Sequence, residues 1–158
     1  MNKEDIKKLE DISKKIKSLN VKIKFLSLLE KAKLEFEQNK LQDCENTCLE
    51  ILKTDVENSV ALRGLGCVMQ AKGEIKKALE YYNKALKYSK NKEIEYTLIG
   101  TIYYNEENLE KAIEYYNLAI DVNDNYDLAY EGRNQSLLEN HLQILDLQDS
   151  LIKRNIFK

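Results

Sequence analysis

The sequence predicts an all-α fold, and two observations lead to this prediction. Proline is absent and glycine occurs only five times in 158 residues, whereas sheet-rich domains need more of the residues that make turns. Two stretches that begin 34 residues apart, KGEIKKALEYYNKAL at 72–86 and EENLEKAIEYYNLAI at 106–120, are nearly the same. Both place apolar residues at helical spacing, so a repeated helical unit is expected.

Length and composition indicate one globular domain. Charged residues make up 33% of the chain and hydrophobic residues 43%, which is typical of a chain that buries a core. No apolar run approaches the roughly 20 residues that cross a bilayer, and the first residues, MNKEDIKKLEDISKK, contain no apolar signal region. We therefore expect a cytoplasmic protein with no membrane partner.

Residues 1–24 are predicted to form an amphipathic helix with a heptad seam. The seam residues are Leu9, Ile12, Ile16, Leu19 and Ile23. Eight lysines and four acidic residues are interleaved along this segment, and arginine is absent, which favours a solvated face over a nucleic-acid site. Two uses of the seam remain open. It packs against the first repeat as a cap, or it pairs with another molecule or lies in a neighbour's groove.

Aligning the chain at a period of 34 residues gives three rows, 25–58, 59–92 and 93–126. Within the second helix of each row, the apolar positions are separated by three or four residues. Across the rows these positions align in columns, such as Cys48, Tyr82 and Tyr116. Glycine in the middle of a helix is unfavourable, so Gly66 and Gly100 are interpreted as points of close helix approach. The small residues expected to face these glycines are Ala78 and Ala112. Tyr82 and Tyr116 are expected to be buried with the hydroxyl at the edge.

Short polar segments separate the two helices of each row. Gly73 and Asn39 are suited to a left-handed turn residue. Glu107 takes the same place in the third row, so that turn is expected to be strained or built differently. After the third row, residues 127–158 keep an apolar stripe but lose the repeat pattern. They are predicted to form one or two helices that close the open end of the stack.

Catalysis, metal binding and a cofactor are not expected. The cysteines, Cys44, Cys48 and Cys67, are odd in number and are interpreted as small buried residues. The single histidine, His141, has no identifiable partner, and the acidic residues at 106–114 surround a helix start, where acids are favourable.

The rows resemble the tetratricopeptide repeat, whose unit is a 34-residue helix–turn–helix. The stretches that carry the resemblance are LRGLGCVMQAKGEIKKALEYYNKAL and YTLIGTIYYNEENLEKAIEYYNLAI; row one matches less well. The proline that usually ends each unit is replaced by Val56, Lys90 and Asp124. The resemblance implies a right-handed superhelical stack of helical hairpins with terminal capping helices.

The resemblance also implies a non-catalytic module that binds a peptide or helix of a partner protein in a concave groove. By register, the groove is expected to include Lys33, Phe36, Arg63, Cys67, Gln70, Thr97, Thr101, Tyr104, Asn105 and Glu131. The polar side chains among them are the favoured binding residues, because packing of the core does not explain polar side chains on that face. Replacing Arg63 or Tyr104 is accordingly expected to weaken binding with little loss of thermal stability.

One subclass of this family binds a carboxylate at the end of its partner through a clamp of basic and amide side chains. The corresponding positions here are Leu29, Lys33, Gly64, Ile94 and Leu98, four of which lack a side-chain donor, so this mode is not expected. The alternative function is a scaffold that forms homo-oligomers through its terminal helices. In that hypothesis the basic segment 1–24 of one copy is attracted to the acidic third repeat of the next.

Overall fold

A computed structural model describes the backbone of residues 3–156 and the side chains of residues 4–152. These residues form seven helices and no strand, so the all-α prediction is confirmed. The helices are α1 (Lys3–Glu37), α2 (Leu41–Thr54), α3 (Ser59–Ala71), α4 (Ile75–Tyr88), α5 (Lys92–Asn105), α6 (Leu109–Val122) and α7 (Asp127–Ile156). The outermost residues of the predicted terminal segments, 1–2 and 157–158, lie outside the described part.

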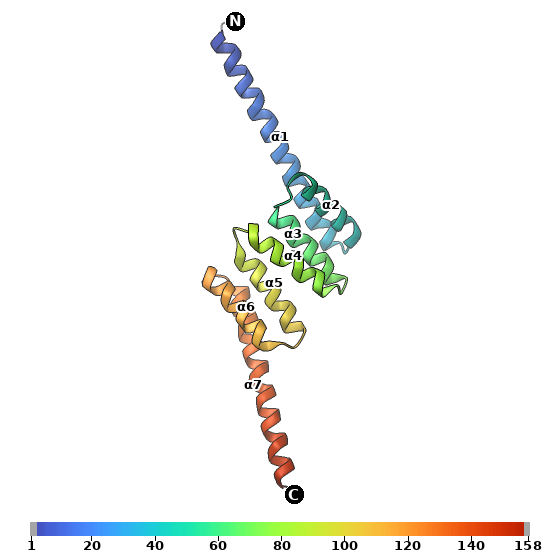
Figure 1. Ribbon diagram of the computed structural model, residues 1–158, viewed down its shortest axis with the longest axis vertical. Coiled ribbons are helices and arrows are strands. Elements are labelled where there is room, and N and C mark those ends of the chain that lie inside the picture. The colour runs from blue at the N-terminus through green and yellow to red at the C-terminus, as the bar shows by residue number, and fades with distance from the viewer. Residues whose placement is uncertain (1–2, 157–158) are drawn as a thin grey trace.

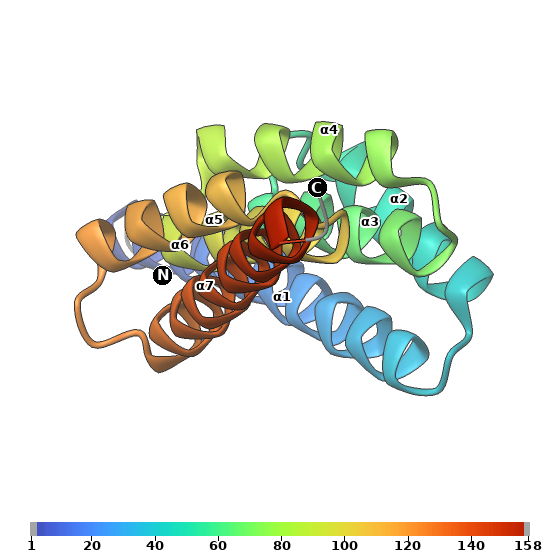
Figure 2. The same ribbon diagram turned by 90° about the horizontal axis from the view of Figure 1, so that it is seen from below.

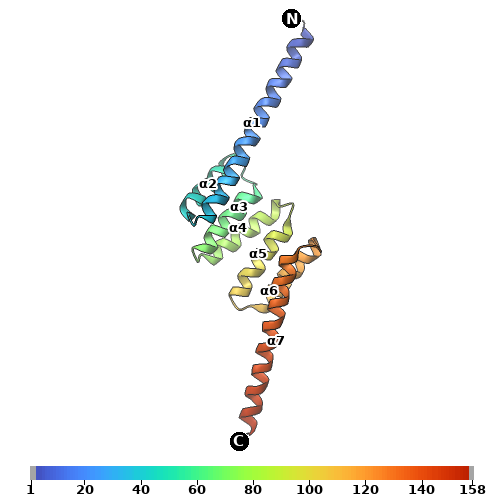
Figure 3. The ribbon, with the colours of Figure 1, turned by 180° about the vertical axis from the view of Figure 1, so that it is seen from behind.

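The helices pack as a stack of hairpins. Helix α1 packs against α2, α3 against α4, and α5 against α6, and α7 continues the stack on α6. Neighbouring hairpins meet through α2 with α3 and α4 with α5. Helices α1 and α7 leave the stack at opposite ends (Figures 1 and 3). Viewed from below, α1 and α7 lie on one side of the stack and α4 on the other (Figure 2).

The three turns inside the hairpins are built in the same way. Asn39, Gly73 and Glu107 have φ angles of 57°, 77° and 59°, all in the left-handed region. In each turn the next amide donates a hydrogen bond to the carbonyl five residues earlier, as in a Schellman motif. These bonds are Lys40 to Glu35 at 2.8 Å, Glu74 to Met69 at 2.9 Å and Asn108 to Tyr103 at 2.9 Å. The third turn is therefore not built differently, although its left-handed residue carries a side chain.

Tyrosine rings of the second helices lie directly on glycines of the first helices. A Cβ added to Gly66 would lie 2.5 Å from Cδ1 of Tyr82, and one added to Gly100 would lie 3.0 Å from Cε1 of Tyr116. Gly132 of α7 approaches the same Tyr116 ring. The glycines are thus points of close approach, but the groups nearest to them are these rings and not the expected alanines. Both alanines are fully buried.

Helix α1 differs from the expected arrangement because residues 1–24 do not form a separate helix. The helix continues without a break from Lys3 to Glu37, since no glycine or proline interrupts the sequence near Phe25. Every side chain from residue 4 to residue 24 is exposed. Of the two uses left open by the sequence, the exposure of these residues disfavours a cap on the first repeat and leaves pairing with another molecule. We call residues 4–24 the α1 arm.

Helix α7 combines two environments along one continuous helix. In its first half Ala129 and Ser136 are fully buried, and this half packs on α5 and α6. From residue 141 to residue 152 every side chain is exposed. The closing role expected of the segment is therefore limited to its first half. We call residues 138–152 the α7 arm; the side chain of Ile156, which continues its stripe, lies outside the description.

The ring-on-glycine contacts lead to a prediction about stability. Alanine is favoured over glycine in a helix by roughly 1 kcal/mol, whereas overpacking a core costs about 1–3 kcal/mol. Because the Tyr82 ring is fully buried, the steric cost should prevail in Gly66→Ala and lower the free energy of unfolding by roughly 1–2 kcal/mol. The looser contact at Gly100 should leave Gly100→Ala close to neutral. Denaturant titrations measure both, and a more stable Gly66→Ala protein would contradict the prediction.

Candidate functional site

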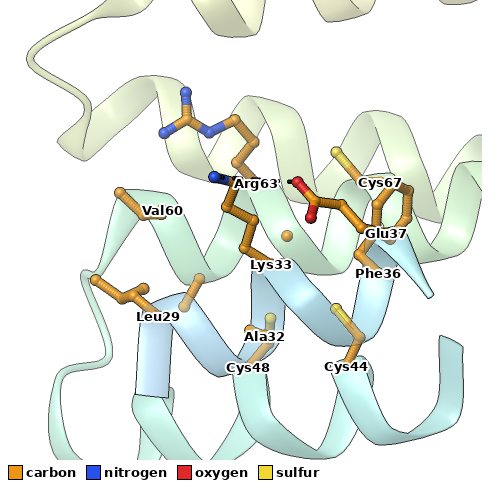
Figure 4. A pocket seen from close by; sticks show the side chains of 12 residues that line it. Leu29, Ala32, Lys33, Phe36, Glu37, Cys44, Cys48, Val60, Arg63 and Cys67 are labelled. Atoms are coloured by element: carbon orange, nitrogen blue, oxygen red, sulfur yellow. Dashed lines mark ion pairs between the residues drawn. The ribbon is translucent and has the colours of Figure 1, made fainter. Parts of the chain in front are cut away.

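The residues predicted to line one groove are divided between hollows. The first hollow has a volume of about 230 Å³ and lies among α1, α2 and α3 (Figure 4). Its lining is Leu29, Ala32, Lys33, Phe36, Glu37, Cys44, Cys48, Val60, Ala61, Arg63, Gly64 and Cys67. Four predicted groove residues, Lys33, Phe36, Arg63 and Cys67, are therefore brought together. The rest of the wall is largely aliphatic or thiol.

Each cation of the first hollow is paired with an acid of the chain. Lys33 Nζ lies 4.0 Å from an oxygen of Glu37, and Figure 4 shows these two side chains pointing toward one another. Arg63 Nη1 lies 3.6 Å from Oε1 of Glu95. The hollow is thus an apolar cavity whose positive charges are compensated locally.

The three cysteines line this hollow together. Cys44 and Cys48 are buried, as expected, and Cys67 is partly buried. Burial raises the pKa of the Cys48 thiol to about 12, and burial is also the main cause that raises the pKa of Cys44 and of Cys67. The thiols are therefore protonated near neutral pH and serve as apolar wall, not as nucleophiles.

The second hollow has a volume of about 410 Å³ and is formed by α5, α6, α7 and the loop before α7. Its lining is Ile94, Thr97, Leu98, Thr101, Tyr104, Asn105, Tyr116, Tyr126, Leu128, Glu131, Gly132 and Gln135. Five predicted groove residues are among them: Thr97, Thr101, Tyr104, Asn105 and Glu131. This hollow presents more polar groups than the first one.

A third hollow, of about 310 Å³, lies between these two. It shares Val60 and Arg63 with the first hollow and Ile94 with the second. Gln70 lines none of the three; its side-chain oxygen accepts a hydrogen bond from the Tyr82 hydroxyl at 2.8 Å. Nine of the ten predicted residues therefore lie along one path of connected hollows.

Several polar residues on this path have structural partners, contrary to the reasoning from sequence. The Tyr104 hydroxyl donates a hydrogen bond to the carboxylate of Glu139 and accepts one from Gln135 at 2.7 Å. The contact with Glu139 raises the pKa of Tyr104. The Thr101 hydroxyl lies 3.2 Å from the Tyr116 hydroxyl. Tyr104 and Thr101 thus help to position α7 and α6.

Glu95 is the buried group that sequence reasoning missed. Its side chain is fully buried, and neither carboxylate oxygen has a hydrogen-bond partner among the described residues. Its ionic partner is Arg63, so Arg63 is needed to neutralise a buried charge. The alignment of the rows could have indicated that Glu95 is buried, because position 95 shares a column with Ala61, a small apolar residue that is also buried.

Residues 4–152 contain no group of three or more histidine, cysteine, aspartate or glutamate side chains placed to hold a metal ion. Within residues 3–156, each helix is too short or too polar to cross a bilayer. The absence of catalysis and of a cofactor remains a prediction.

Comparison with known families matches two segments to the tetratricopeptide repeat, residues 59–92 and residues 96–126. The chain contains tetratricopeptide repeats. The first row, 25–58, lies outside the matched segments, so its assignment as a repeat of this protein remains a prediction. Among curated proteins, no sequence matches.

Solved structures of other proteins share the fold of this chain. The first repeat domain of Spaghetti (RPAP3) bound to the HSP90 peptide SRMEEVD is 18% identical, with a TM-score of 0.65 over 74% of this chain and 93% of that one. The type III secretion chaperone SycD of Yersinia enterocolitica, in complex with a peptide of the translocator YopD, is 16% identical, with a TM-score of 0.63 over 72% and 92% of the two chains.

A mutant O-GlcNAc transferase of Thermobaculum terrenum is 20% identical, with a TM-score of 0.65 over 72% of this chain. The matched region makes up only 22% of that transferase. At these identities the similarity establishes the fold alone.

The buried ion pair leads to a second prediction. Removing one partner of a buried pair costs roughly 3–5 kcal/mol, because the other charge is left uncompensated. Arg63→Met should therefore lower the free energy of unfolding by about 3 kcal/mol, contrary to the tolerance expected from sequence. The double variant Arg63→Met/Glu95→Met should recover most of this loss. Equal stability of Arg63→Met and the wild type in denaturant titrations would refute the role of the pair.

The thiols lead to a third prediction. An unperturbed cysteine has a pKa near 8.5, so at about pH 9 most unfolded thiols are thiolates, whereas Cys48 remains protonated in the folded protein. Native protein should react slowly with a thiolate-directed reagent at that pH, and protein in denaturant should react fast at all three cysteines. Since the folded state disfavours the thiolates, stability should also fall as the pH rises above 9. Fast labelling of Cys48 in native protein would contradict the burial described.

Proposed function

We propose that the chain is a non-catalytic protein-interaction module that holds a segment of a partner along the three connected hollows. An apolar side chain of the partner is seated in the first hollow, and its flanking backbone lies over Arg63 toward the more polar second hollow. The single observation that carries this proposal is the apolar first hollow with its exposed mouth residue Val60, which is 45% exposed.

The size of the first hollow supports a side chain as its occupant. Pockets for small molecules usually measure about 300–1,000 Å³, and the first hollow, at about 230 Å³, is smaller. An aliphatic or aromatic anchor inserted from an amphipathic segment matches both its size and its lining. Because Lys33 and Arg63 are already paired with acids of the chain, a negative charge on the partner would add little affinity at the first hollow.

Two solved structures with the same fold contain peptides, one from HSP90 and one from YopD, which supports a peptide or helix as the partner here. The carboxylate-clamp mode is not part of the proposal. Leu29 and Gly64 lie in the first hollow, and Ile94 and Leu98 lie in the second. None of these four side chains donates a hydrogen bond to a carboxylate.

Self-association through the terminal helices is a second candidate. It is favoured by the apolar side chains that the α1 arm and the α7 arm expose, and it does not require the hollows.

A matched pair of valine variants tests the groove. Peptides are first selected from a displayed random library against the full chain, and their affinities are measured by fluorescence anisotropy. Val60→Glu places a charge at the mouth of the first hollow and should weaken binding by roughly tenfold or more, a loss of about 1.4 kcal/mol. Val56→Glu is the control, because Val56 is 72% exposed and lines none of the three hollows.

The control variant should bind within about twofold of the wild type, a difference of a few tenths of a kcal/mol. Peptides that bind Val60→Glu as well as the wild type would place the binding surface elsewhere. A library that yields no binder would also count against the proposal.

A further inference from the structure

Two amphipathic arms leave the stack in opposite directions and carry uncovered apolar seams (Figures 1 and 3). The seam of the α1 arm extends by one position beyond the sequence prediction, to Leu26. Each of its six side chains is between 52% and 66% exposed. The members are Leu9, Ile12, Ile16, Leu19, Ile23 and Leu26. An apolar stripe of this length at heptad spacing is typical of a helix that packs against another helix.

The two edges of the α1 seam differ in charge. Each heptad of the seam begins with one of Leu9, Ile16 and Ile23. The residue directly before each of them is a lysine: Lys8, Lys15 and Lys22. The positions on the other edge are Ser13, Asn20 and Ser27. One edge of the seam is therefore a row of lysines and the other is uncharged.

The α7 arm carries a seam with the complementary edge. Its exposed seam residues are Leu138, Leu142, Leu145 and Ile152, and Asp149 takes the one polar position. Glu139 and Asp146 occupy one edge, and His141 and Gln148 occupy the other. Edge residues of two paired helices face one another and select the partner and its direction.

Pairing an α1 arm with another α1 arm, or an α7 arm with another α7 arm, does not bring the lysine edge against the acidic edge. Two antiparallel α1 arms would place the lysine edge against itself, and two parallel α1 arms would place it against Ser13 and Asn20. Two antiparallel α7 arms centred on residue 146 would place Asp146 against Asp146, and two parallel α7 arms would bring both stacks to the same end of the pair. An α1 arm parallel to an α7 arm places the lysine edge against the acidic edge.

The directions of the arms in the fold permit this parallel pairing between copies. The chain enters the stack along α1 and leaves it along α7, at opposite ends (Figure 1). When an α7 arm lies parallel to the α1 arm of a second copy, the two stacks are at opposite ends of the paired helices and do not collide. An antiparallel arrangement of the same arms would bring both stacks to one end.

One register aligns four apolar layers of the two seams and brings Lys15 to Asp146. With Lys8 facing Glu139 and Lys15 facing Asp146, the apolar layers are Ile12 with Leu138, Ile16 with Leu142, Leu19 with Leu145, and Leu26 with Ile152. Asp149 then lies opposite Ile23. The next edge position of α7, Lys153, faces Lys22, and Glu139 already accepts a hydrogen bond from Tyr104. The ionic pair that this register adds is therefore Lys15 with Asp146.

We propose that the α1 arm of one copy pairs in parallel with the α7 arm of a second copy, so that copies join head to tail. The proposal rests on the second candidate function, self-association, and specifies its surface and geometry. A head-to-tail pair still has one unpaired α1 arm and one unpaired α7 arm at its two ends. The contact is therefore heterologous, and the assembly grows with concentration.

Light scattering after size exclusion, from micromolar concentration upward, measures the assembly of the full chain. The wild-type mass should rise above two copies as the concentration increases. Ile16→Asp in the α1 seam and Leu142→Asp in the α7 seam should each reduce the mass to 18.5 kDa. Val21→Asp and Leu147→Asp are the controls, because these exposed residues lie on the faces away from the seams, and both should assemble like the wild type.

Charge reversal tests the pairing of the edges. Lys15→Glu and Asp146→Lys should each assemble less than the wild type, and an equimolar mixture of the two variants should recover assembly. Lys14→Glu and Gln143→Lys carry the same changes in charge away from the edges and should assemble normally. Thermal unfolding of each variant reports whether the stack itself is intact.

The outcomes separate the pairing from the underlying function. A wild-type mass of 18.5 kDa at every concentration would overturn both self-association and the pairing. Assembly that Ile16→Asp abolishes and Leu142→Asp does not would show self-pairing of α1 arms, and the reverse result would show self-pairing of α7 arms. A mass that saturates at two copies would also overturn the head-to-tail geometry while leaving self-association in place.

Discussion

The contact of a tyrosine ring with a bare glycine backbone sets the distance between the two helices of a hairpin, and the rest of the stack follows from it. Tyr82 reaches Gly66 across one hairpin, and Tyr116 reaches Gly100 across the next. Tyr116 also lies against Gly132, so one ring connects α5, α6 and α7. Because a large ring fills the space that two glycines leave, the first helices are held in fixed positions along one face. The second hollow lies at this contact, because Tyr116 and Gly132 are both part of its lining.

Features of the fold that depend on local sequence could be predicted, and features that depend on distant partners could not. Helical spacing and the recurring glycines indicated the hairpins, and the 34-residue register indicated most residues of the hollows. The same register could not show that Tyr104 would meet Glu139 on α7, because that contact joins residues 35 positions apart. Likewise, the pairing of Arg63 with Glu95 depends on how two hairpins approach each other. An apolar seam in the sequence does not reveal whether the chain itself covers it, and for that reason two uses of the α1 seam stayed open.

The third turn shows how strongly the stack determines local structure. Glutamate is an unfavourable residue at a left-handed φ angle, and Glu107 nevertheless adopts 59°. The helices on both sides are fixed by the Tyr116 contacts, and the turn between them has the same hydrogen bonds as the turns at Asn39 and Gly73. Tertiary packing therefore prevails over the preference of a single residue.

The local compensation of charge in the first hollow has a kinetic consequence. Fast association between proteins usually relies on long-range attraction between opposite charges, and salt weakens that attraction. Lys33 and Arg63 are each accompanied by an acid of the same chain, so this face projects little field into the solvent. A partner that docks here is therefore expected to arrive by unsteered diffusion, at roughly 10⁵–10⁶ M⁻¹s⁻¹, with a rate that changes little with ionic strength. Selectivity at such a surface depends on how long the bound segment stays and not on how fast it arrives.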